Sequence, residues 1–367
     1  MQVVRALAFL GVFFSHLPNS GILSSGGAWG VSVFCVLSGF VMTYQHFESE
    51  KISRYSLLDS FKFAAGKIKK LYSLHILMMI LMLPYAYREE KALSIFSASD
   101  FITEIIAHTF LIQSWFPVDK IHYSSLNTVS WYLSMTVMLY IAFPFILKFI
   151  KKIRSTGAAL SFILAAYAAQ ICLGFLSWQI SGTADIYIKS FSHSFYEWFI
   201  YIFPLSRFWE FFIGCCLGFI FMKKNHEKFS KLEYTVAEAA VFILIVLELI
   251  IGDKADTAWW SLVSLYVPTS AALVYLFTER RGAISIFLTK KPLIYLGNIT
   301  PYTYLIHWIV IRYWGVILKR VGLNFLTVPL TFNFIFAFVF TIIFAELWRK
   351  RDKITPFYKK FRTLVFN

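Results

Sequence analysis

An arginine and a histidine near the start of the chain have a spacing that suits chemistry on an extended, charged ligand. Arg5 and His16 stand eleven residues apart in an apolar stretch. In an α-helix this separation returns to within about 20° of the same face and places the side chains about 16 Å apart along the axis. A histidine, with an ordinary pKa of about 6.5, is suited to take a proton from a reacting group. The simpler alternative is that Arg5 is a surface anchor and His16 a packing residue.

Further polar residues stand in the next two apolar stretches. Ser38 and Gly39 lie within the segment 30–40, where small residues allow close approach between helices. Lys67 and Lys70 form a basic turn, and a positive cluster at a helix N-terminus attracts phosphate. The alternative is that these lysines only orient the helix.

Two later stretches combine groups that can act together. Arg207 and Glu210 are three residues apart, so they share a helix face and can form an ion pair. Such a pair is the structural alternative to substrate contact. Thr303, Tyr304 and His307 lie on adjoining turns, where a hydroxyl can orient an imidazole. His307 could equally be a packing residue.

The elements that must position these residues are long apolar segments. Of the 367 residues, 58% are hydrophobic and 15% are charged, and the mean hydropathy is +0.65. These values exclude an ordinary soluble domain. The net charge of +15 arises from short basic clusters between apolar segments, which favours the lipid bilayer over nucleic acid as a partner. We expect an all-α, polytopic transmembrane helical bundle with about ten spanning helices, over residues 3–20, 28–46, 70–88, 130–150, 156–180, 203–222, 234–252, 258–278, 295–318 and 326–348.

The distribution of basic residues predicts the orientation of the bundle. If the shorter apolar piece 101–116 does not span, most Lys and Arg residues fall on one side, and both termini are cytoplasmic. We therefore expect 101–116 to be re-entrant or interfacial, with His16 deeper in the membrane than Arg5. The sequence predicts one membrane domain over 1–350 and a short basic cytoplasmic tail over 351–367, without a removable signal peptide. All four cysteines lie in apolar stretches, so we expect no disulfide framework and no metal site.

In this order the pieces resemble the type 3 membrane acyltransferases, bacterial integral-membrane O-acyltransferases and O-acetyltransferases of surface carbohydrates. The similarity extends over nearly the whole chain. Arg5 and His16 stand at the spacing of the family's Arg-x10-His motif, the segment 30–40 is similar to its second-helix signature, and 67–70 to its basic RxxR-like turn. The stretches 131–144, 207–214 and 296–308 follow in the expected order.

The sequence departs from the family pattern at several positions. Thr136 stands where the family commonly has a glutamate, so an acid function there is in doubt. Lysines replace arginines at 67 and 70, which keeps the charge but loses the bidentate fork. We expect no extracytoplasmic SGNH-type extension, which some members carry, after the last apolar segment.

The resemblance implies transfer of an acyl group, most commonly acetyl, from acyl-CoA to a hydroxyl of a carbohydrate such as an O-antigen or capsule. The expected location is the bacterial cytoplasmic membrane. Arg5, Lys67 and Lys70 are expected to contact the coenzyme A phosphates from the cytoplasmic side. His16 is the predicted general base, or the nucleophile of an acyl-imidazole route, and His307 a proton relay or oxyanion donor. The residues expected to contact the substrate are Ser38, Trp131, Arg207, Glu210, Tyr304 and Trp308.

Two other classes of function fit parts of the pattern. Charged groups within a bundle of helices also suit a transporter or a flippase of a glycan or lipid-linked substrate, although no pair of matched halves is evident. Because Thr136 replaces the family's glutamate, a membrane scaffold without catalytic activity is a third interpretation. An enzyme would transfer label from acyl-CoA without any ion gradient across the membrane, whereas a transporter or a scaffold would not.

Overall fold

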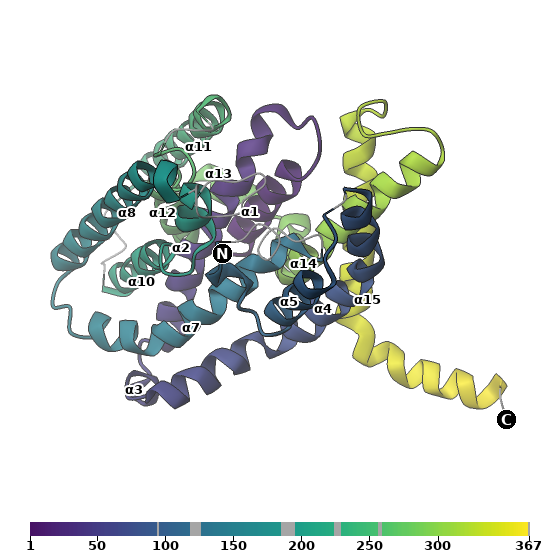
Figure 1. The fold of residues 1–367 in the computed structure, drawn as a ribbon. Coiled ribbons are helices and arrows are strands. Elements are labelled where there is room, and N and C mark those ends of the chain that lie inside the picture. The colour runs from purple at the N-terminus through teal and green to yellow at the C-terminus, as the bar shows by residue number, and fades with distance from the viewer. Residues whose placement is uncertain (94, 118–125, 185–194, 224–228, 256–258, 366–367) are drawn as a thin grey trace.

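The computed structural model describes residues 1–93, 95–117, 126–184, 195–223, 229–255 and 259–365, with side chains described up to 351 except at 182–184. Every regular element in these ranges is helical, which confirms the all-α fold (Figure 1). Helix α15 (Leu330–Val365) lies at one side of the bundle, and its C-terminal part projects away from it. The predicted tail over 351–367 falls on this part, where the side chains beyond 351 lie outside the described residues.

The first two helices form a tight hairpin. Helix α1 (Gln2–Ser15) is followed by a short 3-10 helix, η1 (Gly21–Ser25), and by α2 (Gly26–His46). Helix α1 ends five residues before the predicted boundary because Asn19 and Gly21 adopt positive φ angles of 61° and 57°, which reverse the chain. A Cβ on Gly30 would lie 2.4 Å from the Ala8 carbonyl oxygen, so the glycine lets the two helices meet at backbone distance.

Helix α2 packs against α10 (Phe208–Lys223) through a pair of glycines, Gly39 and Gly214. A Cβ on Gly39 would lie 2.0 Å from the Phe211 carbonyl oxygen, and a Cβ on Gly214 would lie 2.0 Å from the Val36 carbonyl oxygen. Both contacts are with main-chain atoms, which cannot move aside as a side chain can. The small residues next to Ser38 are therefore needed for packing.

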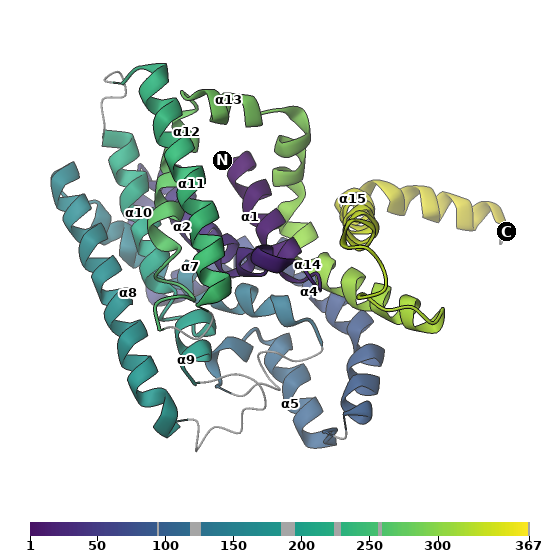
Figure 2. The same cartoon turned by 90° about the horizontal axis from the view of Figure 1, so that it is seen from above.

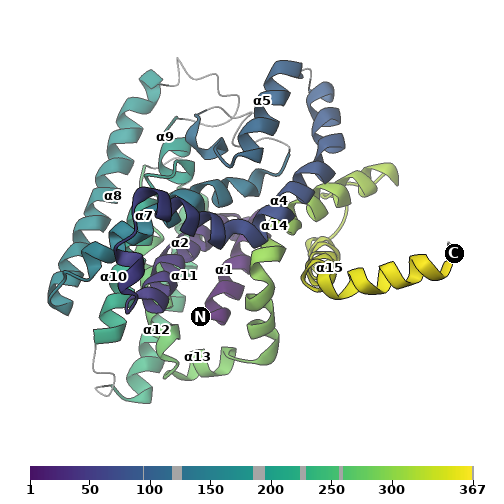
Figure 3. The same ribbon diagram turned by 90° about the horizontal axis from the view of Figure 1, so that it is seen from below.

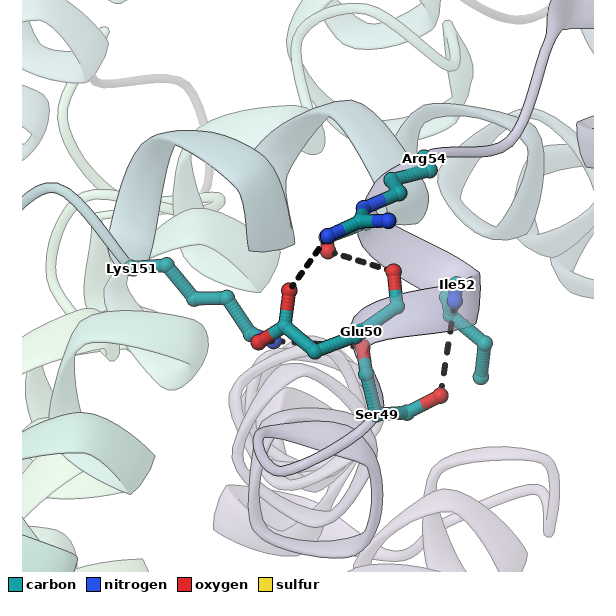
Figure 4. Close-up of polar contacts among 6 residues, drawn as sticks. Ser49, Glu50, Ile52, Arg54 and Lys151 are labelled. Carbon is teal, nitrogen blue, oxygen red and sulfur yellow. Dashed lines mark hydrogen bonds and ion pairs between the residues drawn. The ribbon is translucent and has the colours of Figure 1, made fainter.

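The connection from α2 to α4 is tied to the end of α7. Helix α3 (Glu50–Ser53) precedes α4 (Leu57–Ala92), and α7 is Trp131–Ile150. The Lys151 ammonium lies 2.7 Å from a Glu50 carboxylate oxygen and donates to the Ser49 carbonyl at 3.2 Å (Figure 4). Hydrogen bonding to Lys151 lowers the pKa of the Glu50 carboxyl. Helix α4 begins thirteen residues before the predicted start at 70 because Ser56 and Asp59 form a capping box.

The segment predicted to be re-entrant contains a short helix and a turn. Helix α5 (Ala98–Thr109) has 12 residues, which rise about 18 Å, too little to cross a hydrocarbon layer of about 30 Å. A 3-10 turn, η2 (Gln113–Trp115), follows, and another, η3 (Thr128–Ser130), precedes α7. The amide of Gln113 and the ring of His108 both bond to Ser130, at 3.2 and 3.1 Å, which fixes this segment to the start of α7.

The remaining helices complete the bundle around α1 and α2. Short helix α13 (Ala283–Leu288) joins α12 (Val267–Glu279) to α14 (Lys291–Arg320) at the end of the bundle where the N-terminus lies (Figures 2 and 3). Helix α14 packs against both α1 and α15. The other bounds are α8 (Thr156–Ala184), α9 (Phe195–Glu197), the π-helical turn η4 (Trp198–Ile202) and α11 (Lys231–Lys254).

Each of the ten predicted ranges contains a helix, but the number of membrane crossings is not confirmed. Among the described residues, six segments are long and apolar enough to cross, and they contain α2, α4, α7, α8, α11 and α15. Helices α1, α10 and α12 have 14, 16 and 13 residues. Helix α12 starts nine residues after the predicted boundary, with Pro268 in its first turn. The chain is a multi-pass membrane protein whose core is formed by short and long helices together.

Candidate active site

The two predicted catalytic histidines meet, although 291 residues separate them. Nε2 of His307 lies 3.0 Å from Nδ1 of His16. His16 caps the C-terminus of α1, and His307 lies in the buried middle of α14. The two helices approach closely because a Cβ on Gly297 would lie 1.9 Å from the Gln2 carbonyl oxygen, a contact that only glycine permits.

The hydrogen bonds assign the proton positions in the neutral pair. Nδ1 of His307 lies 2.7 Å from the Tyr304 carbonyl oxygen and 3.3 Å from that of Thr303. A carbonyl only accepts, so this nitrogen carries the proton, and Nε2 of His307 is the acceptor. Nδ1 of His16 therefore donates to His307. The lone pair of His16 is then on Nε2, the nitrogen that can take a proton from a substrate hydroxyl.

Aromatic rings enclose the histidine pair. The rings of Phe9 and Phe13 lie 5.7 and 5.9 Å from that of His307, and Trp308 meets His16 edge to face at 5.1 Å. His307 is fully buried, whereas His16 is partly exposed. The arrangement fixes one imidazole in the core and leaves the other accessible, as a base that acts on an external substrate requires.

A cavity of about 260 Å³ gathers five of the positions singled out in the sequence. Arg5, Lys67, Ser38, Thr136 and Tyr304 all line it. The Tyr304 ring is also 5.8 Å from the ring of His307, so this tyrosine stands between the cavity and the histidine pair. Neither histidine lines the cavity itself.

The two cations of the cavity have polar neighbours but no carboxylate partner within the described ranges. Nη1 of Arg5 donates to the Gln2 side-chain oxygen at 3.1 Å, and Nζ of Lys67 lies 2.9 Å from Nε2 of His46. Both positive charges are therefore available to an anionic ligand, which can replace these neutral contacts.

The remaining candidates lie elsewhere. Lys70 is exposed and does not line the cavity, because three residues along a helix rotate it about 60° away from Lys67. Trp131 is buried against Tyr201, with ring centroids 5.0 Å apart, and has no face open to a ligand in this arrangement. The contact with coenzyme A phosphates expected of Lys70 and the substrate contact expected of Trp131 stay predictions.

Arg207 and Glu210 form the ion pair that their spacing predicts. Nε of Arg207 lies 2.9 Å from Glu210, and both side chains are fully buried. The guanidinium also lies 4.0 Å from Sγ of Cys35 and 5.4 Å from the Tyr201 ring centroid. A buried pair of this kind supports the structural alternative, since removing one partner leaves a charge without compensation. A role in substrate binding stays a prediction.

Sequence reasoning missed several residues next to these groups. Tyr132 and Tyr140 line the cavity together with Thr136, and the Ser38 hydroxyl lies 3.4 Å from that of Tyr140. The signal was present, because positions 132, 136 and 140 repeat every four residues and share a helix face. His46 was missed because nothing in its own helix connects it to Lys67.

The fold and the site together define a class, a multi-pass helical membrane protein with a partly exposed imidazole near a cavity lined by two cations. Residues 1–347 match the family described as the acyltransferase domain, and the chain belongs to this family, acyltransferase family 3. This confirms the resemblance seen in the motifs.

Similar proteins come from several bacteria. The chain is 23% identical over 329 residues to the O-acetyltransferase OatA of Staphylococcus aureus, covering 84% of this chain and 49% of OatA. It is 25% identical over 330 residues to the acyltransferase MdmB of Streptomyces mycarofaciens, covering 84% of this chain and 78% of MdmB. It is 24% identical over 362 residues to the putative peptidoglycan O-acetyltransferase YrhL of Bacillus subtilis, covering 94% of this chain and 52% of YrhL.

The chain spans about half the length of OatA and YrhL. No solved structure matches it.

Proposed function

We propose that this chain transfers a short acyl group, acetyl first, from acyl-CoA to a hydroxyl of a carbohydrate outside the cytoplasm of a bacterial cell. The observation that carries the proposal is the hydrogen bond between His16 and His307 beside a cavity that holds Arg5 and Lys67. Family membership and the acyltransferase names of the relatives support the reaction class.

The donor enters from the end of the bundle where Arg5 and Lys67 lie. Ligand pockets for whole molecules generally have volumes of about 300 to 1,000 Å³, so a cavity of about 260 Å³ suits the narrow pantetheine arm alone. The phosphates and the nucleotide then remain at the mouth. Arg5 and Lys67 attract the phosphates, and the exposed Lys70 adds positive charge at the approach.

The thioester must pass Tyr304 to reach the base. The phenol ring lies between the cavity and the histidines, so a change of its rotamer opens the route. Because Tyr304 also lines the cavity, the donor itself can displace the ring when it binds. In the absence of donor, the tyrosine keeps the cavity separate from the accessible side of His16.

The transfer step needs only the two histidines and the two substrates. Nε2 of His16 takes the proton of the acceptor hydroxyl while its oxygen attacks the thioester carbonyl carbon. The positive charge on His16 is stabilised because Nδ1–H donates to Nε2 of His307. The carbon–sulfur bond then breaks, and the proton on His16 passes to the departing thiolate. The products are the O-acyl carbohydrate and free coenzyme A.

The experiment is a transfer assay with purified protein in lipid nanodiscs, labelled acetyl-CoA and a carbohydrate acceptor, without any gradient. The wild type is expected to label the acceptor, and His16→Ala to lose this activity while still binding the donor. Transport of a glycan without acyl transfer would give no label and would overturn the proposal. Wild-type labelling by His16→Ala would remove His16 from the mechanism.

A further inference from the structure

A further cation, Arg312, lies near the histidine pair and does not line the cavity that holds Arg5 and Lys67. The Arg312 guanidinium lies 4.1 Å from the ring centroid of Trp308, one helical turn before it on α14. The same indole ring meets the His16 ring edge to face at 5.1 Å. Arg312 and His16 therefore contact two parts of one side chain, and they are close enough to interact electrostatically.

The surroundings of Arg312 leave its charge available. It is half-buried, and its polar partner is the hydroxyl of Tyr85, which itself donates to Glu89 at 2.9 Å. No carboxylate forms an ion pair with Arg312 within the described part of the chain. A partly buried guanidinium with several free donors binds a carboxylate or a phosphate through two parallel hydrogen bonds.

Trp308 supplies a second unused donor at the same place. Its side chain is 9% exposed, and its indole Nε1 has no hydrogen-bond partner among the described residues. A buried N–H without a partner is costly unless a ligand accepts from it. Trp308 therefore offers one donor without a partner, and Arg312 offers a guanidinium without a carboxylate partner in the described part of the chain, both close to His16.

We propose that Arg312 and Trp308 bind the acceptor, and that this acceptor is an anionic carbohydrate whose carboxylate or phosphate belongs to the sugar unit that is acylated. The anionic group binds the Arg312 guanidinium, and the Trp308 N–H donates to a ring or hydroxyl oxygen. The neighbouring hydroxyl then faces Nε2 of His16. This inference rests on the proposed acyl transfer and adds the class of acceptor to it.

The test measures binding separately from activity. Arg312 is modified in nanodiscs with an arginine-selective dicarbonyl, and its labelling is followed by mass spectrometry in the presence of an alkyl glucuronide, an alkyl sugar phosphate or the matched neutral glucoside. Slower labelling with an anionic sugar and unchanged labelling with the glucoside are expected. The two anionic arms show whether the site takes a carboxylate, a phosphate or both. Equal labelling with all three sugars overturns the proposal.

Transfer assays then compare variants with the same sugars. Arg312→Gln is expected to reduce the preference of kcat/KM for the anionic over the neutral sugar by about 10- to 100-fold, the effect of losing a charged hydrogen bond. Arg312→Lys should restore part of this preference, and Arg88→Gln, an exposed change on α4, should leave it intact. A preference that survives in Arg312→Gln refutes the assignment. Protection of Arg312 without any transfer by the wild type would instead refute the proposed function.

Discussion

Replacing His307 with leucine should slow acyl transfer without weakening donor binding. Leucine keeps an apolar side chain among the rings of Phe9 and Phe13 but removes the acceptor for Nδ1–H of His16. In the transition state that hydrogen bond comes from a charged imidazole, and such bonds contribute about 1.5 to 3 kcal/mol. At 1.4 kcal/mol per tenfold change, kcat should fall by roughly 10- to 150-fold.

Three further variants test whether His307 acts by positioning His16. Glutamine at 307 offers a side-chain oxygen to His16, so His307→Gln should retain more activity than His307→Leu. His16→Ala removes the proposed base and should lower kcat by a factor of about 10² to 10⁴. In the double variant His16→Ala with His307→Leu, no further loss is expected, because His307 acts through His16.

The assay is transfer from labelled acetyl-CoA at saturating donor and acceptor, with donor binding measured in parallel. Wild-type turnover in His307→Leu would refute the positioning role. A loss in His307→Leu as large as in His16→Ala, with no recovery in His307→Gln, would also refute it, because His307 would then react directly with a substrate.

Three further predictions follow from the cavity and the packing. Lys67→Gln should raise the KM for acyl-CoA several-fold with little change in kcat, whereas Lys70→Gln should have a smaller effect because Lys70 lies outside the cavity; equal effects would contradict this assignment. Gly39→Ala places a Cβ 2.0 Å from a main-chain oxygen, and should destabilise the fold by about 1 to 3 kcal/mol, seen as a lower Tm; an unchanged Tm would count against the packing described. Arg207→Leu should destabilise by about 3 to 5 kcal/mol, and adding Glu210→Leu should recover much of this loss; recovery of full activity along with stability would show that the pair does not bind substrate.

The sequence was sufficient to predict what lies within one helix. Arg5 lies in α1 and His16 caps its C-terminus, and Arg207 pairs with Glu210 three residues on. The same three-residue spacing predicted that Lys67 and Lys70 would act together as one basic turn. Motif resemblance also grouped the two lysines, but the structure places only Lys67 in the cavity.

Contacts between helices could not be predicted from the sequence. The contact between His16 and His307 depends on how α1 packs against α14, which glycine positions permit but do not specify. The same holds for His46 beside Lys67 and for Trp308 beside His16. The end of α1 was misplaced because the prediction followed hydropathy to residue 20, although Pro18, Asn19 and Gly21 are turn-forming residues and the chain reverses there.

The hydrogen bond from Nδ1 of His307 to the Tyr304 carbonyl bears on whether acyl transfer depends on the proton gradient across the membrane. An amide carbonyl cannot accept the proton for onward passage, so the relay ends there and opens to neither compartment. In the proposed mechanism, a proton removed from the acceptor would therefore stay on the His16 imidazole until the departing thiolate takes it. That cycle would exchange no net proton with either aqueous phase, and we expect the rate of transfer to be unchanged by a pH difference imposed across the bilayer.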